Sequence, residues 1–248
     1  MRRLTLIICV AMFGIAACST QSATETLPDP MQLLHEATDN VLGVETLRMT
    51  VERTGMDYAL KTDLGSATFD RMEAQYQSPD TLQARAKVTL AGLPVEIEIF
   101  AKDEDQWWRL AGTDWQNLIF LPGFNPRSLL QDKDRGLRAA FGALKNVQIA
   151  GETQLEDGST AYHLTATADG AEISWLMVYL VEITGSTTID AYIDKTNRLP
   201  VKLAVTEPDT AADPAGARVW TMEFYDFNAV TSLTPPPPVP TVESTPIS

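Results

Sequence analysis

The sequence predicts an α+β fold in which a large antiparallel sheet carries a few helices gathered on one face. Long stretches alternate apolar and polar residues with a period of two, the spacing of β-strands. They follow one another with short turns between them, so that neighbouring strands can pair as hairpins. Helical spacing is confined to residues 31–44 and 129–144, and many strands beside few helices are typical of α+β proteins.

The N-terminus has the features of a bacterial secretory signal. Arg2 and Arg3 give a positive start, an apolar run follows, and small residues lead to Cys18. The run is shorter than the about 20 apolar residues of a membrane-spanning helix. We therefore expect residues 1–17 to be a signal peptide that is removed.

The end of this segment, Ile15-Ala16-Ala17-Cys18, resembles the lipobox of bacterial lipoproteins. That resemblance implies that Cys18 becomes the lipid anchor of a protein held outside the cytoplasm on a membrane of the cell envelope. An ordinary signal peptide with an incidental cysteine is the alternative. Residues 18–28 are polar and have the composition of a flexible linker. Because Cys9 leaves with the signal, no intrachain disulfide is expected.

The charge limits the partners. The chain of 248 residues has 33 acidic and 19 basic residues and a formal net charge of −14. Phosphate backbones and anionic headgroups would repel such a surface, which disfavours nucleic-acid binding and polybasic docking to membranes. Attachment to a membrane is therefore expected to come from the lipid on Cys18.

The first half of the domain begins with a helix. Asp29 and Pro30 are a typical N-cap and first helical residue, and the helical spacing continues to Val44. Alternation then predicts strands over residues 47–52, 82–90, 95–99 and 107–110, the middle two forming a long hairpin. The acidic triplet 103–105 is expected to be a solvated turn, because calcium loops need a longer ligand pattern.

The middle of the chain changes character. Asn125-Pro126 is a second N-cap, and the helical spacing over 129–144 is interrupted near Gly136, which predicts two short helices or one broken helix. The loop 119–124 places large apolar residues around a Pro-Gly turn. Such a loop either folds under the helices as core, which we favour, or forms the rim of an apolar opening.

Strands resume in the C-terminal half. They are predicted over residues 161–165, 173–181, 189–194, 201–205 and 220–224, with a turn at 195–200. Residues 234–248 are rich in proline and lack apolar residues to bury. We expect this tail to be disordered and solvated, and a recognition strand for an unknown protein partner is the alternative.

The order of landmarks resembles the LppX/LprAFG lipoproteins, which are related in fold to the carriers LolA and LolB. The landmarks are Cys18, the helix 31–44, Gln106-Trp107-Trp108 with Asp114-Trp115, Phe124-Asn125-Pro126, 147–152 leading to 161–164, 193–200, and Tyr225-Asp226-Phe227-Asn228. The resemblance implies a lipid-binding domain over 29–233. In that family the sheet curls into a half-barrel with helices on its concave face and an apolar cavity for acyl chains. The apolar run 173–184 and the proline-rich tail depart from the pattern.

Twelve apolar residues are our candidates for lining such a cavity, because a period of two places them on one face of the sheet. They are Val88, Leu90, Val95, Ile97, Ile99, Trp108, Leu110, Leu164, Ile189, Ile193, Leu203 and Phe224. The residues alone leave open whether they surround a cavity or pack against the helices without one.

Catalytic patterns are not found in the sequence. It has no Gly-x-Ser-x-Gly, His-Glu-x-x-His, P-loop or Gly-x-Gly-x-x-Gly pattern. His35 and His163 are the two histidines, and neither lies in a nucleophile pattern. The acidic residues have no spacing that selects a catalytic pair. We therefore expect no enzyme activity, no cofactor and no metal site.

We expect a membrane-anchored envelope lipoprotein that binds the acyl chains of a lipid or lipidated molecule and carries or presents it. The alternative is a cell-surface sensor or interaction module that binds a protein partner, for which an exposed apolar patch on the outer face or edge of the sheet would be the sign. The outward positions disfavour this alternative because they are polar: Arg85, Lys87, Glu96, Glu98, Asp190 and Lys202.

Overall fold

A computed structural model describes residues 27–62, 65–119, 121–132, 134–177, 181–213, 216–229 and 232–236. The predicted signal peptide, the anchor Cys18, most of the linker and most of the tail lie outside these residues. The described chain forms one antiparallel sheet in the order β7-β6-β5-β4-β3-β1-β12-β11-β10-β9-β8, with β2 paired to β3. Strands β7 and β8 are its two edges, so the sheet is not closed.

The strands are β1 (Thr46–Thr54), β2 (Ala59–Thr62), β3 (Gly65–Gln77), β4 (Thr81–Leu90), β5 (Leu93–Lys102), β6 (Asp105–Leu110), β7 (Gln116–Asn117), β8 (Lys145–Gln154), β9 (Thr160–Asp169), β10 (Ser186–Asp194), β11 (Pro200–Glu207) and β12 (Arg218–Tyr225). The helices are α1 (Pro30–Leu42), α2 (Arg127–Leu130), α3 (Gly136–Gly142) and α4 (Gly170–Ile173), with 3-10 turns η1 (Ser174–Met177) and η2 (Pro208–Thr210).

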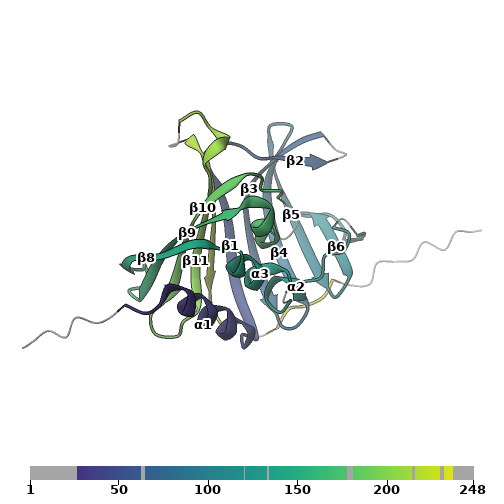
Figure 1. Cartoon of the computed structure of the whole chain (residues 1–248). Coiled ribbons are helices and arrows are strands. Elements are labelled where there is room, and N and C mark those ends of the chain that lie inside the picture. The colour runs from purple at the N-terminus through teal and green to yellow at the C-terminus, as the bar shows by residue number, and fades with distance from the viewer. Residues whose placement is uncertain are drawn as a thin grey trace, which may run out of the picture.

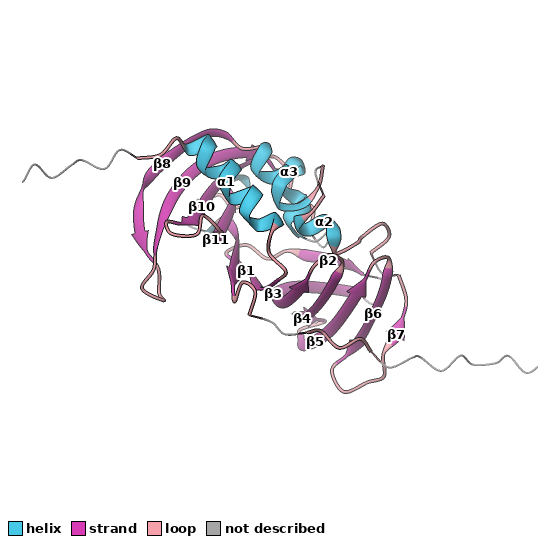
Figure 2. Cartoon of the chain, turned by 90° about the horizontal axis from the view of Figure 1, so that it is seen from below, coloured by secondary structure: helices cyan, strands magenta, loops and turns pink. Residues whose placement is uncertain are grey.

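The sheet is strongly curved, and α1, α2 and α3 lie on its concave side (Figure 1; Figure 2). Strands β8 to β11 curl around these helices, while β4 to β7 extend away from them (Figure 2). The predicted class, an α+β half-barrel with helices on the concave face, is confirmed. No helix among the described residues has the length and apolar character needed to cross a membrane.

Helix α1 begins where the sequence predicts. The Asp29 carboxylate accepts a hydrogen bond from the Gln32 backbone N–H at 2.8 Å, which caps the first turn. The face that the helix buries against the sheet consists mainly of Leu33, Leu34, Ala37 and Val41. Burial of this apolar stripe stabilises a helix that would be marginal by itself at this length.

The strand predicted over residues 173–181 is wrong. Residues 173–177 lie at the end of α4 and in η1, because Asp169 accepts the Ala171 N–H at 3.0 Å and caps a helix there. Within this helical stretch Ile173 and Met177 are buried four residues apart, which is helical spacing. An unbroken run of apolar residues does not distinguish a buried strand from a buried helix.

The structure adds strands that the sequence did not indicate to us, namely β2, β3, β7 and β8. The hairpin β4–β5 and the strands β1, β6 and β9 to β12 are confirmed, each with ends shifted by a few residues. The helical region is confirmed as two short helices, α2 and α3, with the break at Gly136.

Candidate functional site

The concave face of the sheet carries rows of apolar side chains that cross many strands. One row joins residues paired directly across ten strands: Leu110, Ile97, Ala86, Met72, Val51, Met222, Leu203, Ala191, Leu164 and Ile149. Directly paired residues of an antiparallel sheet share a face. The twelve candidate residues follow this register, so they lie on the face that the helices cover.

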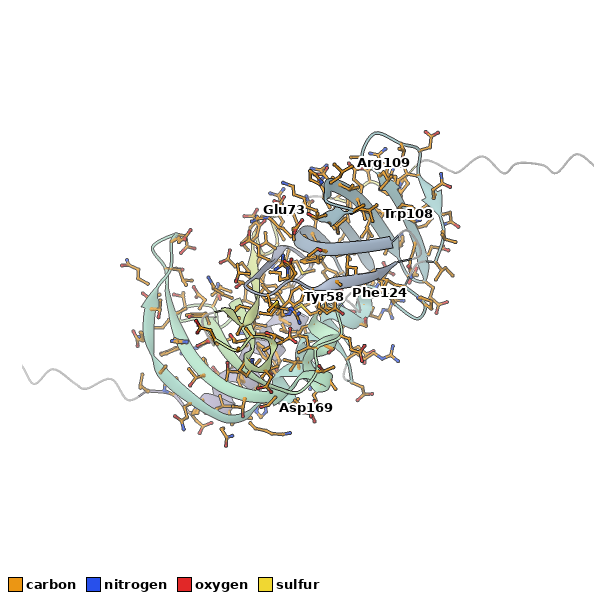
Figure 3. All side chains as sticks on the ribbon, turned by 90° about the horizontal axis from the view of Figure 1, so that it is seen from above. Tyr58, Glu73, Trp108, Arg109, Phe124 and Asp169 are labelled. Atoms are coloured by element: carbon orange, nitrogen blue, oxygen red, sulfur yellow. The ribbon has the colours of Figure 1, made fainter. Side chains whose placement is uncertain are left out.

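The extent of burial divides the twelve candidate residues into two groups. The buried ones are Val88, Ile99, Leu164, Ile189, Ile193, Leu203 and Phe224. Leu90, Val95, Ile97 and Trp108 are half-buried, and Leu110 is 38% exposed. The second group lies on β4 to β6, the part of the sheet that extends away from the helices (Figure 2). Figure 3 shows Trp108 at that end of the molecule, far from Asp169.

A small apolar space lies at the centre of the molecule, between the sheet and the helices. It is lined by Leu47 and Met49 of β1, Tyr76 of β3, Leu129 and Leu130 of α2, Leu137 of α3, Leu176 of η1, and Met222 and Phe224 of β12. Among the described residues that line this space, Phe224 is the only one of the twelve candidates. The sequence did not single out the others, because they belong to unpredicted β3, to helices, or to positions that look like ordinary core.

The space measures about 20 Å³. That is room for roughly one water molecule, whereas pockets that bind small molecules have about 300–1,000 Å³. This space is therefore nearly filled by the side chains that line it. A larger ligand fits only if the helices that form the roof of the space move away from the sheet.

The roof is made of short helices. Helices α2 and α3 have four and seven residues. The Asn125 side-chain oxygen accepts the Arg127 N–H at 2.9 Å at the start of α2, whereas α3 has no side-chain hydrogen bond at its N-cap. Gln131, just after α2, donates to the Ser78 hydroxyl at 2.6 Å and ties the roof to the end of β3. Short helices depend on tertiary packing for their stability, and these two are held mainly by their buried apolar side chains, such as Leu130, Leu137 and Phe141.

Tyr76 supplies a polar group beside the apolar space. Its side chain is fully buried, and its hydroxyl donates to the Pro79 carbonyl at 2.8 Å. Burial raises the pKa of this phenol to about 12. The group is therefore a neutral hydrogen-bond donor that fixes the turn after β3.

The loop 119–124 is core in its second half. Phe124 is buried and Leu121 packs half-buried against the core. The buried amide of Gln106 donates to the Leu121 carbonyl at 2.8 Å and accepts the Leu121 N–H at 2.9 Å. Ile119 at the start of the loop is 60% exposed, and Phe120 lies outside the described residues. The core interpretation is confirmed for Leu121 and Phe124.

The face turned away from the helices is polar. Arg85 lies opposite Glu98, and Glu98 accepts from Arg109, which lies over the Trp115 ring. Figure 3 shows Arg109 at the same end of the sheet as Trp108. Further along this face His163 contacts the Asp190 carboxylate at 2.7 Å and stacks on a neighbouring tyrosine. The described residues include no group of three or more His, Cys, Asp or Glu side chains that would hold a metal ion.

Comparison with known proteins agrees with this geometry. The sequence profile of the LppX_LprAFG lipoproteins matches residues 29–232. This chain belongs to the LppX_LprAFG lipoprotein family. The family assignment confirms the resemblance, since the match covers the sheet, the helices and the central space.

Two solved structures of such lipoproteins share the fold. LprF from Mycobacterium bovis superposes with a TM-score of 0.62 at 18% identity, covering 85% of this chain and 98% of LprF. LppX from Mycobacterium tuberculosis gives a TM-score of 0.55 at 16% identity, covering 84% of this chain and all (100%) of LppX. At these identities the likeness establishes the fold alone. No curated protein matches the sequence.

Proposed function

We propose that this LppX_LprAFG protein is a membrane-anchored envelope lipoprotein that binds acyl chains and carries or presents the lipid or lipidated molecule that bears them. The observation behind this proposal is the central apolar space, whose nine described lining residues come from both the sheet and the helical roof. A surface of this kind favours methylene groups at about 25 cal/mol for each Å² removed from water.

Binding requires the roof to open. Acyl chains enter between β1, β3 and β12 on one side and α2, α3 and η1 on the other, and the roof closes over them. The exposed residues of the same face on β4 to β6 extend the apolar surface beyond the roof. The central space, which Phe224 helps to line, is therefore the inner part of the binding surface. The half-buried candidate residues on β4 to β6 form a looser outer part: Leu90, Val95, Ile97 and Trp108.

The anchor places the domain at a membrane. Cys18, with its acyl chains, holds the protein outside the cytoplasm, and residues 18–28 leave the domain within a short distance of the bilayer. A tethered carrier collects its ligand from, or delivers it to, the membrane in which it sits. No catalytic residue takes part.

Native mass spectrometry tests the proposal. The chain from residue 19 onward is incubated with extracted envelope lipids and analysed without denaturation. We expect retained lipid, and its release after unfolding. A chain that is folded by circular dichroism but retains no lipid would refute the proposal.

A second candidate is a binding module for a protein partner. Leu93, Leu110, Leu118 and Ile119, on or near strands β5 to β7, are 68%, 38%, 57% and 60% exposed. Exposed apolar side chains near the edge of a sheet are typical of interaction sites. A photo-crosslinking residue at Leu118 in intact cells tests this: a specific protein adduct is expected, and its absence would reject the module.

A further inference from the structure

A second, polar hollow lies beside the roof, in a cleft between α1 and α3. It measures about 670 Å³ and is lined by Leu34, His35, Thr38, Asp39, Asp134, Arg138, Ala139, Phe141 and Gly142. The two helices run next to each other on the concave side (Figure 2). The cleft has an apolar floor, because Leu34 and Phe141 belong to the buried core, and a rim of ionisable side chains.

The ionisable side chains of the rim make no hydrogen bonds or ion pairs with other described residues. Arg138 is half-buried and is the one arginine of the described chain with no such partner; the others are all engaged. Among the described residues, the carboxylates of Asp39 and Asp134 and the ring of His35 likewise have no hydrogen-bond or ion-pair partner. The opposite face of the sheet differs, because there Arg85, Glu98 and Arg109 join in ion pairs.

The rim therefore carries positive and negative side chains that form no ion pairs with one another. A guanidinium binds a phosphate through several N–H donors. Carboxylates accept hydrogen bonds from an ammonium group. An anionic ligand would meet the Arg138 guanidinium but would be repelled by the two carboxylates, whereas a ligand with one phosphate and one ammonium matches both.

The position of the cleft relates it to the acyl site. Leu137 lines the central apolar space, and the next residue of α3, Arg138, lines the cleft. Phe141, four residues after Leu137 and on the same face of α3, also lines the cleft, so the two regions adjoin along α3. A lipid whose chains lie under the roof can place its headgroup over α3, against the rim.

We propose that the α1–α3 cleft recognises a zwitterionic lipid headgroup, with its phosphate on Arg138 and its primary ammonium on Asp39 and Asp134. This inference rests on the proposed acyl binding. It narrows the ligand from any acylated molecule to a phospholipid with an ammonium that can donate hydrogen bonds.

Competition among lipids with the same acyl chains tests the inference on the chain from residue 19 onward. The probes are phosphatidylethanolamine, phosphatidylcholine, phosphatidylglycerol and diacylglycerol, each displacing one fluorescent lipid. Phosphatidylethanolamine should bind about tenfold tighter than diacylglycerol, the effect of one hydrogen bond to a charged group. It should also bind more tightly than phosphatidylcholine, whose ammonium has no N–H, and than phosphatidylglycerol, which has no ammonium.

Variants assign the effect to the cleft. Arg138→Gln should reduce phosphatidylethanolamine binding to the diacylglycerol value and leave diacylglycerol binding unchanged. Asp39→Asn with Asp134→Asn should remove the preference over phosphatidylcholine. The control Lys87→Gln removes one positive charge from an exposed position on β4 and should change neither value. An equal loss in Lys87→Gln would show a general charge effect and overturn the inference.

Further outcomes separate the inference from the proposed function. Equal binding of the four lipids would overturn headgroup recognition and leave acyl binding intact. Failure of all four to bind would overturn the proposed function, and the inference with it. Phosphoethanolamine, which has both charges but no acyl chain, should compete weakly; competition as strong as that of the lipid would make the cleft a site for a free small molecule instead.

Discussion

The Glu207 carboxylate accepts the indole N–H of Trp220 at 2.8 Å, and both side chains are buried. The same carboxylate also accepts a hydrogen bond from the Arg218 guanidinium, with 3.2 Å between the nitrogen and the oxygen. The Trp220 ring in turn packs against two other rings. Its centroid lies 5.5 Å from that of Tyr58 and 5.6 Å from that of Phe69. One buried carboxylate therefore holds together the ends of β11 and β12 and the segment that leads into β2.

Replacement of Glu207 by alanine should destabilise the protein by about 1–3 kcal/mol, because it leaves the buried indole N–H of Trp220 without its acceptor and removes the ion-pair partner of the half-buried Arg218, whose guanidinium keeps the Met56 and Asp57 carbonyls. Urea unfolding followed by tryptophan fluorescence measures the loss. Glu207→Gln is the matched control: its amide oxygen still accepts from Trp220, so the loss should be smaller. Equal losses in the two variants would contradict the role of the indole hydrogen bond.

The buried phenol of Tyr76 should lower the stability of the folded protein at high pH. Its pKa is raised by burial from 10.0 to about 12. Between these values the unfolded chain has lost the phenol proton while the folded chain keeps it, so the free energy of unfolding falls as pH rises, by at most about 1.4 kcal/mol per pH unit. Below pH 10 both states are protonated and the effect is absent.

Comparison with Tyr76→Phe isolates the pH dependence that the Tyr76 phenol causes, because phenylalanine does not titrate. Urea unfolding at pH 9 and pH 11 should show a steeper decline for the wild type than for the variant. The variant should also be less stable at pH 9, since it lacks the hydrogen bond to the Pro79 carbonyl. Parallel declines in the two proteins would contradict the burial of the phenol.

Gly136 controls how closely the roof helices pack. It has a φ of +68°, and a Cβ there would lie 2.1 Å from the Ser128 carbonyl oxygen and 2.3 Å from that of Leu129. Gly136→Ala therefore has to separate α3 from α2, and we expect a loss of about 1–3 kcal/mol. If acyl chains enter under the roof, the variant should also exchange bound lipid faster.

Gly142→Ala provides the control for this change. Gly142 lies at the end of the same helix, and no atom would lie within 4 Å of its Cβ. The variant should be neutral or gain about 0.4–1 kcal/mol from reduced freedom of the unfolded chain. Thermal melts compare the two variants with the wild type; a stable Gly136→Ala protein would contradict the tight contact.

Local sequence patterns predicted what depends on one element at a time. The Asp29 cap, the hairpin between residues 82–90 and 95–99, and the break at Gly136 each follow from nearby residues, and each is confirmed. Strand β3 was missed because a bulge between Phe69 and Arg71 interrupts its alternation. The run after Ile173 was misassigned because its apolar residues have no clear period.

The site was harder to predict than the sheet. Alternation shows which side chains share a face, but it does not show which part of that face the helices cover. Which part the helices cover depends on residues that are far apart in the chain. An example is Tyr76 of β3, which lines the central space together with Leu130 and Leu137 of the roof helices. The pattern therefore placed Ile97 and Leu203 in one group, although the first is half-buried and the second fully buried.

The last prediction decides which part of the concave face binds acyl chains most closely. Leu176 of η1 and Ile97 of β5 are both half-buried aliphatic residues that pack against the core, but only Leu176 lines the central space. Leu176→Trp should fill the space and reduce lipid uptake at least about tenfold, while Ile97→Trp should leave uptake nearly unchanged, because its side chain has room toward solvent. Fluorescent-lipid titration measures uptake, and a melt of each variant shows whether overpacking, at about 1–3 kcal/mol, accounts for any loss. If Ile97→Trp blocks uptake and Leu176→Trp does not, the ligand lies on β4 to β6 outside the roof, and the central space is ordinary core.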